Sequence, residues 1–213
     1  MQPKDTHYHR NLPHIHPEGY PLFITFRLAD SLPLDVLQEL TAHRERNSKS
    51  QSPDEIYKIE KKYFGRYDEW LDRCISGQRW LENKNVANIV ADKIHSMNGK
   101  HFRLMAYCIM PNHVHLLIES IISNHLEHLG KTAKYPVTDA LRLLKGSTAR
   151  ACNLKLKRNG QFWNHESYDH YARDEQELKR IVKYILNNPV KAGLAKEWKD
   201  WQFTHINPQL GEW

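Results

Sequence analysis

Stretches rich in β-forming side chains predict a sheet. Four such stretches occur in the chain, at residues 20–28, 101–110, 113–120 and 167–173. The second and third are separated only by a Pro-Asn pair, so they are expected to be antiparallel neighbours. Proline cannot supply the positive φ that a two-residue primed turn needs at its first position, so a wider, bulged connection is predicted.

Apolar residues at spacings of three and four predict five helices. They cover about residues 34–46, 54–71, 86–97, 139–153 and 174–188. The first is interpreted as the crossover between the first two long strands. A polar breaker at residues 47–53 starts what is predicted to be a helical insertion over about 48–99, either a lid over the substrate or plain core. The last helix is expected to end at Asn188 because Pro189 disfavours helical geometry in the preceding residue.

The third predicted strand carries a His-x-His pair. Side chains alternate along a strand, so His113 and His115 are expected on one face and Val114, Leu116 and Ile118 on the other, in a core. Imidazole is a common ligand of divalent cations, and two on one face leave positions open for other ligands. The alternative is a pair of ordinary sheet histidines.

A tyrosine and an amide lie one above the other on the last predicted helix. Tyr184 and Asn188 are four residues apart, on the flank of its apolar stripe. If this flank faces the histidines, two imidazoles and an amide oxygen can hold Mg²⁺ or Mn²⁺ beside a phenol. The pKa of a free tyrosine is about 10, so its attack on a phosphate would need such a cation. The alternative is a partly buried helix tyrosine.

Basic residues dominate the end of the fourth predicted helix. The chain has 31 Lys and Arg against 25 Asp and Glu, a net charge of +6. Between residues 142 and 158 no acidic residue interrupts the basic ones, which are Arg142, Lys145, Arg150, Lys155, Lys157 and Arg158. This run is interpreted as a DNA-backbone contact, with a solvated face as the alternative. Phe162 and Trp163 follow and could stack on unpaired bases.

Two further His-x-His pairs lie within residues 7–16 and are not interpreted as metal ligands. Pro13 and Pro17 flank the second pair and restrict the backbone to extended or turn shapes outside a sheet, so a rigid shared face is not expected. The segment is either a loop lying on nucleic acid or a solvated arm.

Cysteine usage and the absence of long apolar runs indicate a cytoplasmic protein. The three cysteines show no CxxC spacing, so neither a disulfide framework nor a zinc knuckle is predicted. The first ten residues are polar, and no run approaches the roughly 20 apolar residues of a membrane helix. The chain is therefore expected to be neither secreted nor bound to a membrane.

Several stretches together resemble the REP-associated tyrosine transposases, a branch of the single-tyrosine HUH transposases. They occur in the order of that family and are LPHIHPEGYPLFITFRLADSLP, YCIMPNHVHLLIE, LKGSTARACN and FWNHESYDHYARDEQELKRIVKYILNNPVKAGL followed by WKDWQF. The resemblance implies an α+β fold, a ferredoxin-like palm with an antiparallel sheet flanked by helices. Residues 1–213 would form one such domain, with the insertion at about 48–99 longer than in a minimal palm.

The same resemblance implies residue roles. His113 and His115 would be the HUH metal ligands and Asn188 the third ligand, for Mg²⁺ or Mn²⁺. Tyr184 would attack single-stranded DNA beside a hairpin, giving a covalent 5′-phosphotyrosine and a free 3′-OH. Relatives act either as homodimers or as monomers, and the sequence leaves this choice open.

Two other functions are compatible with these residues. The first is a domesticated, inactive module that binds DNA hairpins without cutting them. The second is a small-molecule metallohydrolase that holds Zn²⁺ tightly through His113 and His115. Tyrosine-dependent covalent attachment to DNA distinguishes the first from a transposase, and metal analysis distinguishes the second.

Overall fold

A five-stranded antiparallel sheet forms the centre of the fold. The computed structural model describes residues 6–9, 13–17, 19–48, 53–73, 77–121, 136–211 and 213. The strand order is β6-β3-β5-β4-β7. The strands are β3 (Pro21–Leu28), β4 (Phe102–Ile109), β5 (His113–Ser120), β6 (Trp163–Tyr171) and β7 (Thr204–Ile206). The first four have the order of a ferredoxin-like fold, which confirms the predicted class. The three-residue edge strand β7 was not predicted, because it is too short to show an alternating pattern.

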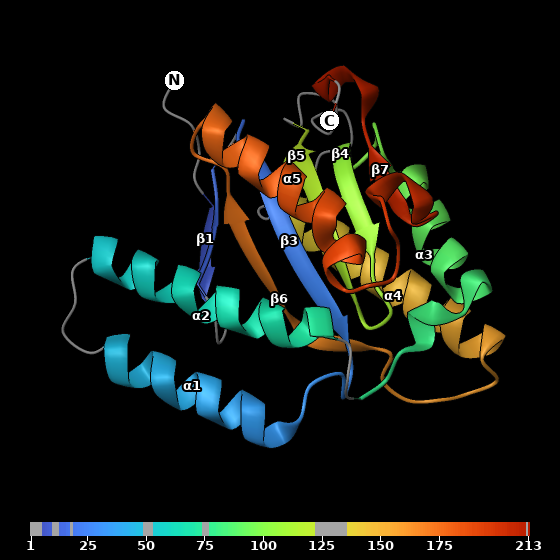
Figure 1. The fold of residues 1–213 in the computed structure, drawn as a ribbon, viewed down its shortest axis with the longest axis horizontal. Coiled ribbons are helices and arrows are strands. Elements are labelled where there is room, and N and C mark those ends of the chain that lie inside the picture. The colour runs from blue at the N-terminus through green and yellow to red at the C-terminus, as the bar shows by residue number, and fades with distance from the viewer. Residues whose placement is uncertain are drawn as a thin grey trace, which may run out of the picture.

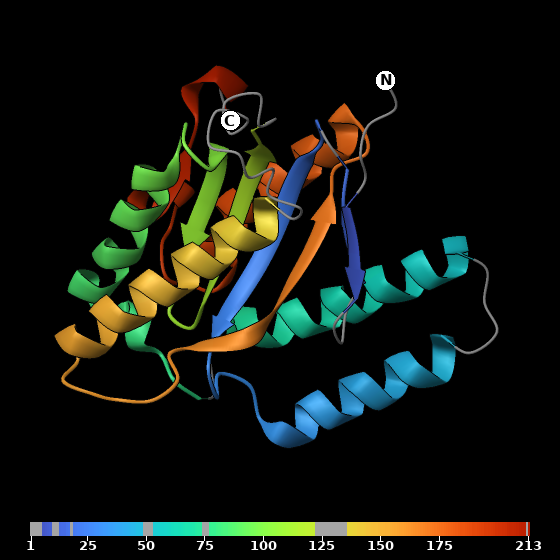
Figure 2. The ribbon, with the colours of Figure 1, turned by 180° about the vertical axis from the view of Figure 1, so that it is seen from behind.

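Helices cover both faces of the sheet. Figures 1 and 2 show α5 (Glu175–Lys191) and α2 (Pro53–Arg73) on one face and α3 (Lys84–Met97) and α4 (Pro136–Lys155) on the other. The remaining long helix, α1 (Leu34–Ser48), packs against α2. Within the described ranges, no helix combines the length and the apolar character needed to cross a bilayer.

The crossover between the first two long strands is α3. The helix predicted at residues 34–46 is present as α1, but its interpretation as the crossover is wrong. α3 packs against α4 and buries six residues along one side, Val86, Ala87, Val90, Ala91, Ile94 and Met97. By contrast, α1 leaves Leu34 70% exposed and buries only Val36 and Leu40 among its apolar side chains described. α1 and α2 therefore lie outside the layer that α3 and α4 form on the other face of the sheet.

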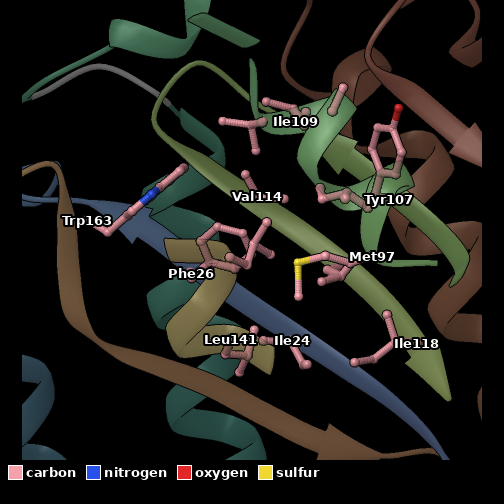
Figure 3. Packing of buried hydrophobic residues seen from close by; sticks show 14 of the residues in the cluster. Ile24, Phe26, Met97, Tyr107, Ile109, Val114, Ile118, Leu141 and Trp163 are labelled. Carbon is pink, nitrogen blue, oxygen red and sulfur yellow. The ribbon is translucent and has the colours of Figure 1, made fainter. Parts of the chain in front are cut away.

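The central strand β5 presents different chemistry to the two faces. Val114, Leu116 and Ile118 enter the core between the sheet and the helices α3 and α4, as Figure 3 shows for Val114 and Ile118. His113 and His115 lie on the opposite side, and both are fully buried. The predicted alternation is confirmed, so the hydrophobic core of one face fixes the direction of the imidazoles on the other.

The turn before β5 consists of Pro111 and Asn112, and the strands pair up to it without the bulge that was predicted. Met110 N–H donates to the carbonyl of His113 at 2.9 Å, and Ile109 pairs with Val114. The carbonyls of Pro111 and Asn112 accept hydrogen bonds from other segments, so the turn is tied into the fold at the base of the histidine strand.

The helix α5 extends beyond the predicted end. It passes through Pro189 to Lys191, because Ala192 N–H still bonds to the Asn188 carbonyl at 3.0 Å. Proline disfavours helical geometry before it without forbidding it. Gly193, at φ 69°, then ends the helix in a left-handed conformation that glycine adopts without strain. The extra turn matters because it keeps Lys191 on the same helix as Asn188.

A side-chain cap closes the N-terminus of α5, and its contribution to stability can be tested. Asp174 accepts a hydrogen bond from Glu177 N–H at 2.7 Å, and Glu177 reaches back to the Arg173 N–H. We expect Asp174→Ala to lower the free energy of unfolding by about 1 kcal/mol, a melting temperature about 2–4 °C lower. Asp174→Asn should melt close to the original chain, because asparagine caps equally well. Equal losses in both variants would mean that the charge, not the cap, is what stabilises the helix.

The N-terminal histidines belong to a small hairpin. Strands β1 (Thr6–His9) and β2 (Pro13–His16) pair with each other in an antiparallel ladder, contrary to the expectation of a segment outside any sheet. Proline is tolerated here because Pro13 is the first residue of its strand. His16 is buried, and its Nε2 lies 3.2 Å from Asp169 Oδ1 on β6, so this histidine anchors the hairpin.

Candidate metal and nucleophile site

The two strand imidazoles direct lone pairs at each other. Asn112 Nδ2 donates to the Leu71 carbonyl, which fixes the amide so that its Oδ1 faces His113 Nδ1 at 2.7 Å. That oxygen only accepts, so His113 carries its proton on Nδ1 and leaves a lone pair on Nε2. His115 Nδ1 lies 2.8 Å from Thr25 Oγ1, directly across the sheet. The two Nε2 atoms are 2.9 Å apart, an arrangement suited to a shared cation.

Two aspartates from α2 complete this cluster, and sequence reasoning missed both. Asp72 Oδ1 lies 3.6 Å from His113 Nε2 and 3.7 Å from His115 Nε2, and Asp68 Oδ1 lies 3.9 Å from His115 Nε2. One ligand atom from each of the four residues lies within 4.8 Å of all the others. The available signal was the spacing of four, which places both carboxylates on one helix face. Because α2 carries many other charged residues, this spacing did not single out the two aspartates.

The two carboxylates differ in their readiness to bind a proton. Burial raises the pKa of Asp68 well above its ordinary value, and the neighbouring Asp72 charge raises it further. Burial also acts against the Asp72 charge, but the His113 and His115 imidazoles outweigh it and hold the pKa of Asp72 below its ordinary range. Lys191 Nζ lies 3.0 Å from Asp72 Oδ2 and favours the same charged form. Asp68 is thus the stronger proton acceptor of the two carboxylates and Asp72 the weaker.

His115 remains neutral at physiological pH. The pKa of His115 falls to about 4, mainly because of burial and then because of the neighbouring His113. A neutral imidazole is the form that ligates a metal.

Asn188 joins the cluster from α5. Its Nδ2 is 3.0 Å from His115 Nε2, and the side chain is almost fully buried. Within the described part of the chain, three buried oxygens around the imidazoles have no hydrogen-bond partner, namely Asp68 Oδ1, Asp72 Oδ1 and Asn188 Oδ1. A half-turn of the amide would present its oxygen where its nitrogen now lies. Buried oxygens of this kind are costly unless something binds them, so the residues fit a divalent cation.

Tyr184 lies beside the cluster, in the same chain. Its ring centroid is 5.3 Å from that of His115, and its hydroxyl donates to Asp68 Oδ2 and lies 3.3 Å from Asp72 Oδ2. Burial and the two carboxylates raise the pKa of this phenol above its ordinary value. The hydroxyl is therefore protonated, with a carboxylate already placed as acceptor of its hydrogen bond.

Three contacts hold α2 against the sheet as a wall of the site. Arg27, next to the histidine strand, donates to the Tyr67 hydroxyl at 2.5 Å. Phe64 stacks on Tyr168 of β6 with ring centroids 3.4 Å apart, and the Leu71 carbonyl accepts the Asn112 hydrogen bond described above. This helical segment was predicted to be either a lid over the substrate or plain core. Phe64 packs in the core, and the aspartates of α2 belong to the site itself.

The predicted basic run lies at the opposite face of the sheet, along α4 and the loop after it. Four of its members are exposed: Arg142, Arg150, Lys155 and Lys157. The other two are engaged within the fold. Lys145 bonds to the His165 carbonyl and to Ser167, and the Arg158 guanidinium lies 3.7 Å above the Trp80 ring. Of the run, Arg142 and Lys145 border a hollow of about 370 Å³ between α4 and β6.

Phe162 and Trp163 are core residues, which corrects the prediction that they stack on bases. They are 1% and 4% exposed, and both belong to the core beneath α3 and α4. Trp163 packs edge-on against Phe26, as Figure 3 shows, and its Nε1–H donates to Thr148 at 2.9 Å. Trp163 begins β6 and Phe162 precedes it, and both residues also line the hollow beside α4.

Two known proteins that resemble this chain in sequence carry the same description. The chain is 29% identical over 106 residues to a REP-associated tyrosine transposase of Haemophilus influenzae (strain ATCC 51907 / DSM 11121 / KW20 / Rd), an alignment that covers 50% of this chain and 60% of the relative. It is 25% identical over 103 residues to the REP-associated tyrosine transposase of Escherichia coli (strain K12), covering 48% of this chain and 53% of the relative. The chain thus spans less than two thirds of either relative.

The fold has a solved counterpart. The structure of a REP-associated tyrosine transposase bound to a REP hairpin aligns with a TM-score of 0.50 and 18% identity, covering 92% of this chain and 80% of the other. At this identity the likeness concerns the fold.

The family model described as "Transposase IS200 like" matches residues 76–188, more than half of the chain. The match contains both strand histidines, Tyr184 and Asn188, whereas Asp68 and Asp72 lie outside it. The chain belongs to the IS200-like transposase family.

Proposed function

We propose that this chain is a metal-dependent tyrosine transposase that cuts and rejoins single-stranded DNA next to hairpins. The observation that supports this proposal most strongly is a cluster within one chain. It joins the Tyr184 hydroxyl, its carboxylate acceptor Asp68 and the paired imidazoles. The family match and the REP-associated relatives support the same assignment. Because one chain supplies all of these groups, a monomer would suffice for cleavage, and a homodimer is not required for it.

In this proposal Tyr184 is the nucleophile. Its phenolic oxygen forms a bond to the phosphorus, the bond from phosphorus to the 3′ oxygen breaks, and that oxygen leaves as a 3′-OH after taking a proton from water. The phenol proton passes to Asp68, which already accepts its hydrogen bond. The 5′-phosphotyrosine keeps the energy of the broken linkage, so a 3′-OH can attack it and reseal the strand or join another one.

His113, His115, Asn188 and Asp72 would hold Mg²⁺ or Mn²⁺ in this proposal. A bound cation would make the attacked phosphorus more electrophilic and balance the charge that builds up on its oxygens. Carboxylate and amide oxygens suit either ion, and the two imidazoles favour Mn²⁺ over Mg²⁺. The contribution of this chain is to fix the direction of each ligand: Asn112 and Thr25 orient the imidazoles, and Lys191 orients Asp72.

The deciding experiment is a search for a covalent protein–DNA adduct. The chain is incubated with Mn²⁺ and a single-stranded oligonucleotide that contains a hairpin, then denatured and separated by size. We expect a band of increased mass that survives denaturation and maps to Tyr184 by mass spectrometry. Hairpin binding without any such band would favour the inactive hairpin-binding module. Tightly held zinc, with no adduct, would favour the metallohydrolase.

The exposed basic residues of α4 are proposed to contact the DNA backbone. We expect Arg150→Gln combined with Lys155→Gln to weaken DNA binding and to flatten its dependence on salt, by about 0.7–0.9 in slope for each lost phosphate contact. Affinity measured over a range of salt concentrations checks this. The matched control removes two positive charges elsewhere, through Lys93→Gln and Lys100→Gln. Equal slopes for the original chain and the α4 variant would show that the run faces water only.

A further inference from the structure

A pocket of about 260 Å³ opens directly beside the proposed nucleophile, between α2, α5 and the sheet. Tyr184, Asp68 and Lys191 line both this pocket and the metal cluster. Its volume is just below the range of about 300–1,000 Å³ that drug-sized ligands occupy, which suits a smaller planar group. No step of the proposed cleavage uses the remainder of its wall.

Four of the ten other residues that line the pocket carry aromatic rings. Phe23, Phe64, Tyr168 and His170 line the pocket with Tyr184. Phe23 is central among them, with ring centroids 5.4 Å from His170, 5.9 Å from Phe64 and 6.0 Å from Tyr184. Ring edges and faces of this kind bind nucleobases by stacking and do so for any base.

The rim of the pocket is cationic. Lys61, Arg180 and Lys191 border it and are exposed to solvent. Lys61 pairs with Glu177 and Lys191 with Asp72, whereas Arg180 makes no ion pair or hydrogen bond within the described residues. An aromatic interior with a cationic rim matches a nucleotide, whose base is planar and whose phosphate is negative.

His170 adds a polar edge to the aromatic wall. Its Nδ1 is buried and has no hydrogen-bond partner in the part of the chain that is described. Burial lowers the pKa of this imidazole to about 4, so the ring is neutral and offers one donor and one acceptor. The unpartnered Nδ1 is therefore available to hydrogen-bond a ligand in the pocket.

We propose that this pocket binds the nucleobase next to the phosphate that Tyr184 attacks. The inference rests on the proposed function and adds a determinant of cleavage position to it. With the base in this pocket, the adjoining phosphate lies toward Tyr184, and the cationic rim holds the strand on the other side.

Gly65 allows the pocket to be filled without disturbing the core. It lies in α2 on the pocket wall, it is exposed, and a Cβ added there meets no atom within 4 Å. Gly65→Leu would occupy the space of the base. Gly65→Ala is the matched control, because it favours the helix in the same way and leaves most of the pocket open.

The experiment uses a DNA hairpin with a single-stranded tail, the tail sequence being selected by binding from random tails. 2-Aminopurine is placed at each tail position in turn, and its fluorescence is followed as the original chain binds. We expect quenching at one position, adjacent to the phosphate that the covalent adduct identifies. An abasic site there should weaken binding about tenfold. Gly65→Leu should abolish the quenching and remove the abasic difference, and Gly65→Ala should preserve both.

The outcomes separate the pocket from the chemistry. Quenching at no position, or the same quenching in Gly65→Leu, overturns the base pocket even where an adduct forms at Tyr184. Quenching that responds to Gly65→Leu, with no adduct in Mn²⁺, supports the pocket and contradicts the proposed cleavage.

Discussion

Replacing Tyr184 with phenylalanine is expected to reduce covalent adduct formation and strand cleavage by at least about 1,000-fold. Only one oxygen is lost, and that oxygen is the one proposed to bond to phosphorus. Affinity for the hairpin should stay within about threefold, because the ring keeps its contacts with Phe23 and His115. Gel analysis of the adduct and equilibrium binding on the same DNA provide the two measurements.

The matched control removes a hydroxyl from a tyrosine on the other face of the sheet. The Tyr107 hydroxyl lies 3.2 Å from His95 Nε2, and burial raises the pKa of Tyr107 to about 12, so it is another shielded phenol. Tyr107→Phe should cut DNA at the original rate. Cutting by Tyr184→Phe at that same rate would remove Tyr184 from the mechanism and leave the metal cluster without its proposed nucleophile.

The sequence predicted the part of the site that regular local patterns encode. The alternation in β5 determines which way His113 and His115 point, and the spacing of four in α5 places Tyr184 with Asn188. Both patterns depend only on neighbours along the chain. The sheet order of the palm came from the resemblance to a family rather than from the pattern, since strand pairing joins distant segments.

Asp68 and Asp72 could not be assigned in this way. Their spacing shows that they share a face of α2, but several other acidic and basic residues of that helix share faces too. What selects them is the docking of α2, which depends on contacts of Arg27, Phe64 and Asn112. These contacts join parts of the chain that are 40 to 104 residues apart. The burial of Phe162 and Trp163 was missed for the same reason, because an aromatic pair after a basic loop looks identical whether it faces solvent or core.

Asp68 should affect stability and activity in opposite directions. In the metal-free protein its charge is buried beside Asp72, and its pKa is raised above the ordinary value. A raised carboxyl pKa means that the folded state binds the proton more tightly than the unfolded state. The group therefore adds stability below about pH 4, the ordinary aspartate value, and this contribution is lost as the pH rises through the raised folded value.

We expect Asp68→Asn to raise the melting temperature of the metal-free protein at pH 7 by about 2–4 °C, equivalent to about 1 kcal/mol. The gain should shrink towards zero near pH 4, where the carboxyl becomes protonated in the unfolded chain as well as in the folded one. Asparagine keeps an oxygen that can accept the Tyr184 hydrogen bond, so the change is mainly one of charge. Adduct formation should nevertheless fall on the order of 100-fold, because the acceptor of the phenol proton and a negative charge near the cation are both lost.

The measurement is thermal unfolding in EDTA and in Mn²⁺, from pH 4 to pH 8. Mn²⁺ should stabilise the original chain more than it stabilises Asp68→Asn, since a ligand that binds only the folded state adds stability according to its affinity. Asp92→Asn, on an exposed position of α3, is the charge-matched control and should change neither result. A lower melting temperature for Asp68→Asn in EDTA would mean that Tyr184 and Lys191 already compensate the buried charge. The cluster would then be a hydrogen-bonded structural site that does not need a cation.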